Sequence, residues 1–250
     1  MKEDIKKGNR TKIRIAASAD LHITTSDAGK WKECFSAISE QADVLVLCGD
    51  MTNSGSVREA AVLGEELQCL RIPVIGVLGN HDHAMGRPDL VAGTLRQAGL
   101  RILEGDCVVM QGIGFAGVKG FGAGFGRYSL APFGETATRT FAEEALIQTR
   151  LLDKALGRLE AADSLAPKVA LTHYAPVQDT VTGEPEPLYP FLGSSRLADP
   201  MIRHRVAVAF HGHAHSGSLE GQLAGVRVFN VARDVLSRAG YRRGFFLYEV

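Results

Sequence analysis

Three histidines, His211, His213 and His215, follow an apolar run over residues 206–210 near the end of the chain. The run predicts a buried strand, and imidazole is the commonest side-chain metal ligand in proteins. Alternate residues just past the end of a strand would point two rings into one crevice. A histidine cluster can also be simple loop polarity, so this stretch alone leaves a metal site and a polar loop equally open.

Other polar residues of the same chemical types also follow apolar runs. They are Asp20, His22, Asp50, Asn80, His81 and His173. In open α/β sheets, ligands bind beyond the carboxyl ends of the strands, so residues far apart in the sequence can meet there. Carboxylate, imidazole and amide oxygen together suit first-row divalent ions. One carboxylate shared by two such ions would hold them roughly 3.5–4 Å apart.

The first hundred residues alternate short apolar runs with segments of helical period. We expect strands over residues 13–19, 44–48 and 73–78, and helices over residues 30–41, 57–70 and 90–98. The continuous run at 44–48 is typical of a strand that is buried on both faces. This alternation predicts parallel βαβ units.

The second half of the chain is less regular. Short strands are expected over residues 101–103, 107–110 and 113–117, before a glycine-rich stretch, 117–127, that predicts a mobile surface loop rather than a phosphate cradle. A long amphipathic helix over 141–159 and a strand over 168–171 follow. The proline-rich residues 176–190 predict an extended loop, and residues 192–203 a short helix. The chain then ends in a β meander over 218–223, 226–230 and 245–250.

At the polar positions the sequence resembles the calcineurin-like metallophosphoesterases. The pattern of that family is DxH, GD, GNH[DE], a single H and GHxH, and this chain contains all five blocks in that order. They read Asp20-Leu21-His22, Gly49-Asp50, Gly79-Asn80-His81-Asp82, His173 and Gly212-His213-Ala214-His215. The resemblance extends from residue 13 to the final strands. It implies an α/β fold, a four-layer α/β/β/α sandwich of two mixed sheets flanked by helices.

The resemblance also implies a role for each matching position. One metal ion would be held by Asp20, His22, Asp50 and His215, and a second by Asp50, Asn80, His173 and His213, so that Asp50 bridges two divalent ions, Mn, Fe or Zn. A hydroxide between the ions would attack phosphorus in line, and His81 would assist the leaving group as a general acid. His211 precedes the last block and is expected to be structural or to support the ligands.

One departure from the family concerns the partner of His81. Some members carry an acidic residue three positions after the GD aspartate, where it orients the motif histidine, and this chain has Asn53 there. An amide can accept a hydrogen bond from imidazole, but it cannot stabilise imidazolium as a carboxylate does. The departure therefore bears directly on how strongly His81 acts as an acid.

Several residues near these blocks have two interpretations. Lys119 and Arg127 flank the glycine-rich stretch and could clamp a phosphate, but solvated loop charges are the preferred interpretation. His83 is expected to be a polar loop residue and His204 a surface residue. Tyr174 would either line the site or pack beside it. The aromatic residues of the glycine-rich stretch are expected to anchor it rather than to stack on a base; they are Phe121, Phe125 and Tyr128.

Composition sets broader limits. Lys plus Arg and Asp plus Glu number 28 each, so no overall field favours nucleic acid or an anionic membrane. No stretch approaches the roughly 20 apolar residues of a membrane helix. The cysteines have no CxxC spacing and are expected to be reduced; they are Cys34, Cys48, Cys69 and Cys107. We expect residues 1–12 to form a flexible, solvated tail without signal-peptide character, residues 13–250 to form one domain, and the location to be cytoplasmic.

The sequence as a whole predicts a dinuclear metal-dependent phosphoesterase, favouring a phosphodiester and a small, nucleotide-like substrate. A phosphomonoesterase and a nuclease of the same chemistry are the alternatives, and the neutral net charge disfavours a nucleic-acid partner. A catalytically silent scaffold with this fold would typically lack ligand residues, and here every ligand position is filled. A metallo-β-lactamase-like site is excluded because the stretch 211–216 has no aspartate at the HxHxDH position. The physiological substrate, the native metals and the oligomeric state do not follow from the sequence.

Overall fold

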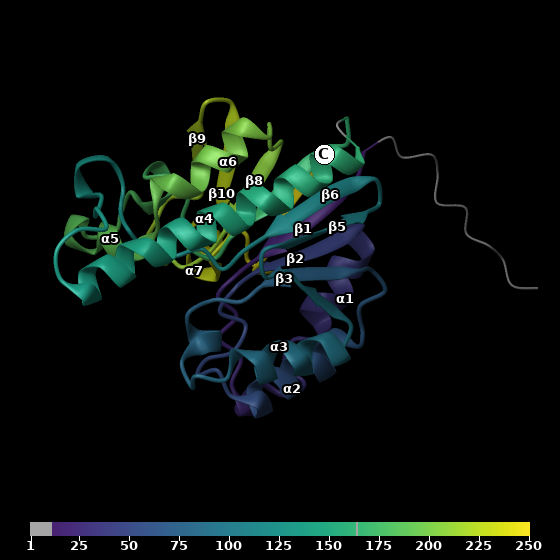
Figure 1. Ribbon diagram of the computed structural model, residues 1–250. Helices are drawn as coiled ribbons and strands as arrows, with labels where there is room; N and C mark the ends of the chain where they lie inside the picture. The colour runs from purple at the N-terminus through teal and green to yellow at the C-terminus, as the bar shows by residue number, and fades with distance from the viewer. Residues whose placement is uncertain (1–11, 164) are drawn as a thin grey trace, which may run out of the picture.

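Two β-sheets packed face to face form the centre of the computed structural model, which describes residues 12–163 and 165–250 (Figure 1). One sheet has the strand order β11-β1-β2-β3-β4, and the other has the order β5-β6-β7-β8-β10-β9. Helices cover the outer face of each sheet. The expected four-layer α/β/β/α sandwich is therefore confirmed, whereas the tail predicted for residues 1–12 lies outside the described residues except for Lys12.

The first sheet is built from the predicted βαβ units. Strands β1 (Arg14–Ser18), β2 (Val44–Cys48), β3 (Val74–Val77) and β4 (Leu100–Ile102) are parallel. Helices α1 (Lys32–Gln41), α2 (Val57–Leu67) and α3 (Pro88–Gln97) connect them. In β2, Leu45 and Leu47 pack towards the helices, while Val44, Val46 and Cys48 pack towards the second sheet. Because both faces of β2 are covered, its sequence is apolar throughout.

The second sheet has a parallel centre with antiparallel edges. Strands β6 (Ile113–Gly117), β7 (Lys168–Leu171), β8 (Val208–His211) and β10 (Val226–Asn230) run parallel, and β5 (Asp106–Met110) and β9 (Glu220–Leu223) are the antiparallel edge strands. Helices α4 (Thr136–Ala162) and α6 (Ala198–Arg203) cover the outer face, on the opposite side of the molecule from α2 and α3 (Figure 1). Phe115, Phe210 and Phe229 fill the space between the sheets.

The predicted C-terminal meander is wrong in its last strand. β9 and β10 form the expected antiparallel pair, but β11 (Phe246–Glu249) crosses to the first sheet and pairs antiparallel with β1. A short helix, α7 (Arg233–Arg238), makes the connection and was missed. Only Val235 and Leu236 of α7 are buried, and one apolar pair is too short to reveal a helical period. This crossing ties the end of the chain to the first strand.

The glycine-rich stretch is also not the mobile surface loop that was expected. Residues 122–125 are buried against residues 190–194, and the amides of Ala123 and Gly124 both donate to the carbonyl oxygen of Gly193. A Cβ on Gly122 would lie less than 3.0 Å from the carbonyl oxygen of Pro190. Glycine here permits close backbone approach rather than motion. The prediction that aromatic residues anchor the stretch is confirmed for Phe125, whose ring is buried, while Phe121 and Tyr128 are half-buried.

The proline-rich residues 176–190 are more compact than the extended loop that was predicted. They contain the 3-10 turns Asp179–Val181 and Glu186–Leu188, and the helix α5 (Tyr189–Leu192) begins at their end. Pro187 and Pro190 stand in the first turn of their helical segments, where a missing amide hydrogen leaves no hydrogen bond unmade.

All four cysteines are free thiols, as expected. Among the described residues, none of the helices has the length and apolar character to cross a membrane.

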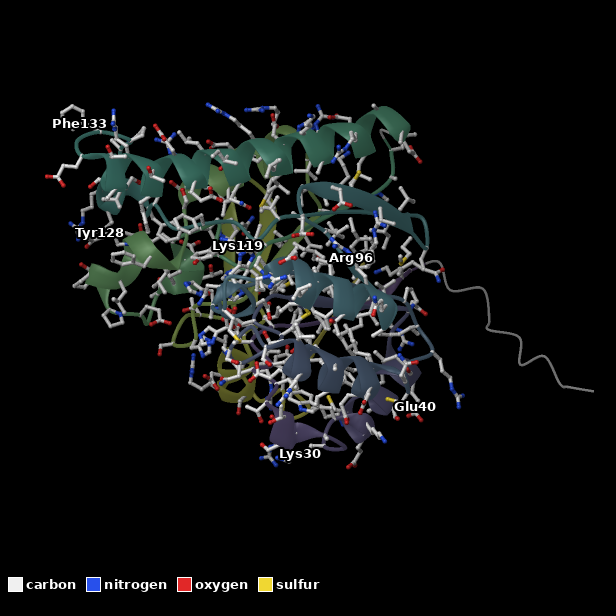
Figure 2. All side chains as sticks on the ribbon, turned by 60° about the horizontal axis from the view of Figure 1, so that its bottom comes forward. Lys30, Glu40, Arg96, Lys119, Tyr128 and Phe133 are labelled. Carbon is white, nitrogen blue, oxygen red and sulfur yellow. The ribbon has the colours of Figure 1, made fainter. Side chains whose placement is uncertain are left out.

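We predict that Phe125→Ala lowers the free energy of unfolding by about 3–5 kcal/mol, because it removes a buried ring that packs on Ala175, Tyr189 and Leu192. The matched control is Phe133→Ala, since Phe133 is 83% exposed and lies at the outer edge of the molecule (Figure 2). The control should change stability by less than about 0.5 kcal/mol. Urea unfolding measures both, and equal midpoints would contradict the anchoring role of Phe125.

Candidate metal centre

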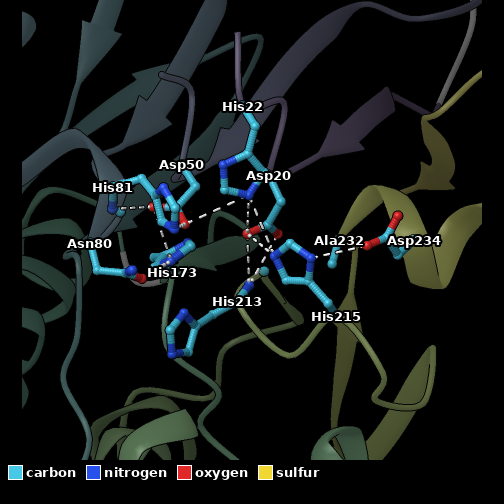
Figure 3. Close-up of polar contacts among 12 residues, drawn as sticks. Asp20, His22, Asp50, Asn80, His81, His173, His213, His215, Ala232 and Asp234 are labelled. Atoms are coloured by element: carbon cyan, nitrogen blue, oxygen red, sulfur yellow. Dashed lines mark hydrogen bonds and ion pairs between the residues drawn. The ribbon is translucent and has the colours of Figure 1, made fainter. Parts of the chain in front are cut away.

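The polar residues singled out in the sequence meet at one edge of the two sheets (Figure 3). They follow the carboxyl ends of β1, β2, β3, β7 and β8, and they are Asp20, His22, Asp50, Asn80, His81, His173, His213 and His215. The side chains of Asp20, Asp50 and His173 are buried. The topology thus brings together every residue that the sequence predicted for the site.

Three groups of these residues could each hold a metal ion. The groups are Asp20 with His22 and His215, Asp50 with His173 and His213, and His22 with Asp50 and His81; within each, one ligand atom per residue lies within 4.8 Å of the others. Asp50 belongs to two groups. Its Oδ1 lies 3.3 Å from His173 Nε2, and its Oδ2 lies 4.0 Å from His22 Nε2. The two oxygens of one carboxylate therefore face two different sets of imidazoles.

Asn80 completes the second of these groups. Its side-chain oxygen lies 2.8 Å from His173 Nε2, the nitrogen that also faces Asp50. His211, by contrast, is not in any of the groups. It is fully buried, contacts the Thr180 hydroxyl at 2.8 Å, and burial lowers its pKa to about 4. The expectation that His211 has a structural role fits this position.

The outer nitrogen of four site histidines is fixed by an acceptor oxygen. The pairs are His173 Nδ1 with the Cys48 carbonyl at 2.9 Å, His215 Nδ1 with the Asp234 carboxylate at 3.0 Å, His81 Nδ1 with the Asn53 carbonyl at 2.6 Å, and His213 Nε2 with the Phe191 carbonyl at 3.1 Å. A carbonyl oxygen only accepts, so the nitrogen facing it carries the proton. In a neutral ring the other nitrogen then has a free lone pair. This arrangement is usual for imidazoles that bind metals.

The electrostatics of the site favour bound cations. Burial disfavours charge on His173, but the charge of Asp50 and the hydrogen bond to it raise the pKa of His173 to about 9. A hydrogen bond to Asp20 likewise raises the pKa of His215 to about 9, against the effect of burial. Although burial opposes ionisation of Asp50, the neighbouring imidazoles hold its pKa below the usual range. Either a proton or a divalent ion can meet this demand for positive charge.

The donor set itself fits divalent ions. His22 Nε2 lies 3.5 Å from His215 Nε2, and each nitrogen lies within 4.0 Å of an Asp20 carboxylate oxygen. Two imidazole nitrogens beside a carboxylate form a set of electron-pair donors that suits a first-row divalent cation. The Nδ1 atom of His22 is buried and has no hydrogen-bond partner among the described residues. His22 is therefore held by the backbone rather than by an outer hydrogen bond.

The backbone at the site adopts an unusual conformation. Asp20, His22, Asp50 and His213 have positive φ angles of 57°, 46°, 47° and 70°, and they are four of the seven described non-glycine residues with positive φ. Such a conformation costs on the order of 1–3 kcal/mol per residue and concentrates at functional sites. Here it occurs within a few residues of the strand ends, where the site side chains leave the sheets.

The glycines of the motifs make room for the charged residues of neighbouring strands. A Cβ on Gly79 would lie less than 3.0 Å from Asp50 Oδ1, and one on Gly212 would lie less than 3.0 Å from Asp20 Oδ2. A Cβ on Gly49 would similarly meet the His173 ring. Each glycine therefore belongs to one motif and leaves room for a side chain of another motif. Sequence reasoning missed this role, although the glycine before Asp50, Asn80 and His213 was the available signal.

Three supporting contacts were also missed. Buried Asp82 accepts hydrogen bonds from the amides of Thr52 and Gly79, both at 2.8 Å, and so joins the ends of β2 and β3. Asp234, on the unpredicted helix α7, orients His215. The partner of His81 is the backbone carbonyl of Asn53 rather than the side-chain amide that the sequence suggested. A backbone acceptor leaves no signal in residue type, which is why the sequence could not reveal it.

The structure distinguishes between the two interpretations of several residues near the motifs. Arg127 is exposed and contacts Tyr128 and Glu186, as expected of a loop charge. Lys119 is not the solvated charge that was expected: it is half-buried, with Nζ 4.7 Å from the Phe121 ring centroid. His204 is not a surface residue either.

The surroundings of His204 and Tyr174 explain these positions. The His204 side chain is 12% exposed, and its two ring nitrogens contact the carboxylates of Asp153 and Glu160 on α4, which cover much of the ring. Tyr174 packs beside the site, with its ring centroid 4.4 Å from that of His213. His83 is half-buried and belongs to none of the three candidate metal-binding groups.

The comparisons with known proteins agree with this geometry. Residues 13–217 match the family described as calcineurin-like phosphoesterase. A search of curated protein sequences found no match. Among solved structures, a phosphopantetheinyl hydrolase from Mycobacterium tuberculosis is similar, with a TM-score of 0.65 and 18% identity over 94% of this chain and 95% of that chain.

Two further solved structures share the fold. The protein TT1561 of Thermus thermophilus has a TM-score of 0.61 and 17% identity over 95% of this chain and 99% of that chain. GAP50, named as the anchor in the inner membrane complex of Plasmodium, has a TM-score of 0.56 and 13% identity over 90% of this chain and 73% of that chain. At these identities the likeness establishes the fold alone.

We predict that Gly79→Ala removes most of the bound metal, because the added methyl group occupies the place of Asp50 Oδ1. The matched control is Gly93→Ala on α3, where a Cβ would meet nothing within 4 Å. Metal per chain after dialysis against manganese, with circular dichroism to compare the folds, distinguishes the two variants. A folded Gly79→Ala protein that retains the manganese content of the control would contradict the steric role of this glycine.

Proposed function

The chain belongs to the calcineurin-like phosphoesterase family, and from that premise we propose that it is a dinuclear metal-dependent phosphoesterase that favours phosphodiesters. The single observation that best supports this proposal is the position of Asp50. One carboxylate faces His22 with one oxygen and His173 with the other, as expected of a residue that bridges two ions. The proposed domain is the unit over residues 13–250.

The proposed ligand sets follow from the groups described above. The first ion would be held by Asp20, His22, Asp50 and His215, and the second by Asp50, Asn80, His173 and His213. Manganese, iron and zinc are the candidates, because each accepts mixed oxygen and imidazole ligands. When bound, two such ions activate water and neutralise charge on the phosphoryl group.

The chain holds both carboxylates in place through backbone amides. The His81 amide donates to Asp50 Oδ1 at 2.8 Å, and the His213 amide donates to Asp20 Oδ2 at 3.0 Å. Each contact links one motif to another, so the carboxylates of β1 and β2 are oriented by residues that follow β8 and β3. A site that is oriented in advance loses less free energy when it binds ions and substrate.

We propose that His81 handles the proton of the leaving group. Its Nδ1–H donates to the Asn53 carbonyl, which fixes the ring and directs Nε2 to a point 3.9 Å from Asp50 Oδ2. The ring also packs edge-on against His22, with centroids 4.5 Å apart. Its side chain is 42% exposed, so a substrate can reach it. Protonated at Nε2, His81 can donate to the departing oxygen.

The alternatives share most of this machinery. A phosphomonoesterase or a nuclease would use the same residues, and the choice of ester separates them. A silent scaffold, the class suggested by the anchor role of GAP50, would not need eight converging polar side chains. A nucleotide-like substrate and a cytoplasmic location stay predictions from the sequence.

We predict that the manganese-reconstituted protein hydrolyses bis-p-nitrophenyl phosphate faster than p-nitrophenyl phosphate. His81→Gln should lower kcat on the diester by about 10²–10⁴-fold, because it removes the proton donor, while metal content stays unchanged. The matched control is His83→Gln, two positions further on, which should retain activity. An inert protein that binds manganese would contradict the proposed activity, and a fully active His81→Gln variant would contradict the role of His81.

A further inference from the structure

A second feature lies beside the candidate metal centre and takes no part in it. A cavity of 490 Å³ opens between the start of α1 and the start of α7, and Arg242 and Arg243 also line it. Its charged and aromatic lining consists of Lys30, Trp31, Glu33, Arg233, Arg242 and Arg243, together with Asp27. The volume is in the range of small-molecule sites. We refer to this cavity as the arginine pocket.

The arginine pocket carries unpaired positive charge. Four basic side chains face two acidic ones, Asp27 and Glu33, and Asp27 is already paired with Lys30 at 2.9 Å. None of the three arginines forms an ion pair with a described residue. Guanidinium groups without a carboxylate partner are available for an anion, and phosphate matches their bidentate geometry. The charge balance therefore points to a phosphate-like ligand.

The framework of the pocket is fixed before any ligand arrives. The Arg233 guanidinium lies 4.4 Å from the Trp31 ring centroid, an arrangement that orients it while leaving its charge free. The Trp31 amide donates to Glu66 at 2.9 Å. The carbonyl of Arg243 accepts a hydrogen bond from the Cys34 thiol at 3.1 Å. Hydrogen bonds thus hold the backbone at Trp31 and Arg243, and the Trp31 ring orients Arg233.

The arginine pocket lies next to the metal centre, because neighbouring residues of α7 contribute to each. Arg233 directly precedes Asp234, whose carboxylate contacts His215 at 3.0 Å. On the other wall, Asp27 and Lys30 lie on the segment that follows His22, and a bridge between Ala19 and Ala232 joins the two segments ahead of the residues that line the pocket. A substrate that binds at the metal centre and extends past Asp234 would therefore approach Arg233, which lines the pocket.

We propose that the arginine pocket binds a second anionic group of the substrate, a phosphate or pyrophosphate remote from the ester that is cleaved. This inference rests on the proposed phosphoesterase activity and narrows it to esters with charge at both ends. The four basic and two acidic side chains of the lining leave a net charge of +2, which suits a phosphate or pyrophosphate group. Arginines would bind a free phosphate anion and a phosphate group of the substrate in the same way. The first arm of the test below measures binding of a free anion, and the second measures the effect of a phosphate group on the substrate.

The first arm measures binding without reference to activity. Trp31 is the only tryptophan in the chain, so its fluorescence reports on the pocket alone. Titration of the manganese-loaded protein with pyrophosphate should change the Trp31 emission to saturation. Arg242→Gln/Arg243→Gln should weaken this binding about tenfold or more, because two charge-assisted contacts are lost. Arg150→Gln, on exposed α4, is the matched control and should bind as the natural chain does.

The second arm compares two p-nitrophenyl phosphodiesters that differ only by a terminal phosphate on the retained alcohol. The double variant should lower kcat/KM about tenfold or more for the ester with the terminal phosphate and leave the other unchanged. Equal effects on both esters would overturn the substrate assignment, and an unaltered Trp31 titration in the double variant would overturn the anion site. If the natural chain hydrolyses neither ester, the proposed activity fails, while the Trp31 titration still shows whether the pocket binds pyrophosphate.

Discussion

The buried carboxylate of Asp50 sets the main constraint on this molecule. It lies between the two sheets, where an uncompensated charge would be costly, and it must be surrounded by groups that satisfy it. The His81 amide, the His173 imidazole and the room left by Gly79 all serve this one side chain. Because these residues come from β2, β3 and β7, satisfying Asp50 requires both sheets to end at the same edge. The packing of the two sheets and the geometry of the candidate site therefore both depend on the charge of Asp50.

A second carboxylate, Asp20, repeats the arrangement on the neighbouring side. Its carboxylate accepts a hydrogen bond from the His213 amide and faces the His215 ring. A Cβ on Gly212 would collide with the same carboxylate. Both aspartates have positive φ angles, a strained conformation for residues other than glycine. The strain is held by hydrogen bonds that continue the strand ladder, such as the Asp20 amide to the Gly49 carbonyl. The strained backbone therefore lowers the stability of the fold at the place where ions and substrate would bind.

The sequence predicted the parts of this account that depend on local pattern. Apolar runs located the strands of both sheets, and the residue types that follow them located the site, because parallel strands bring their carboxyl ends to one edge. What it could not predict depends on distant partners. Asp234 acts through a helix too short to show a period, and β11 joins the first sheet through pairing with residues more than two hundred positions away. The stretch 117–127 was misread because glycine permits both motion and close packing, and only the neighbouring segment at 190–194 decides between them.

The most direct test of the central claim, that Asp50 joins two metal sites, is anomalous X-ray diffraction from crystals of the manganese-loaded protein. We expect two manganese peaks, one beside each carboxylate oxygen of Asp50, with Asp20 and His215 around the first and His173 and His213 around the second. A single peak at full occupancy, or two peaks neither of which contacts Asp50, would contradict the account.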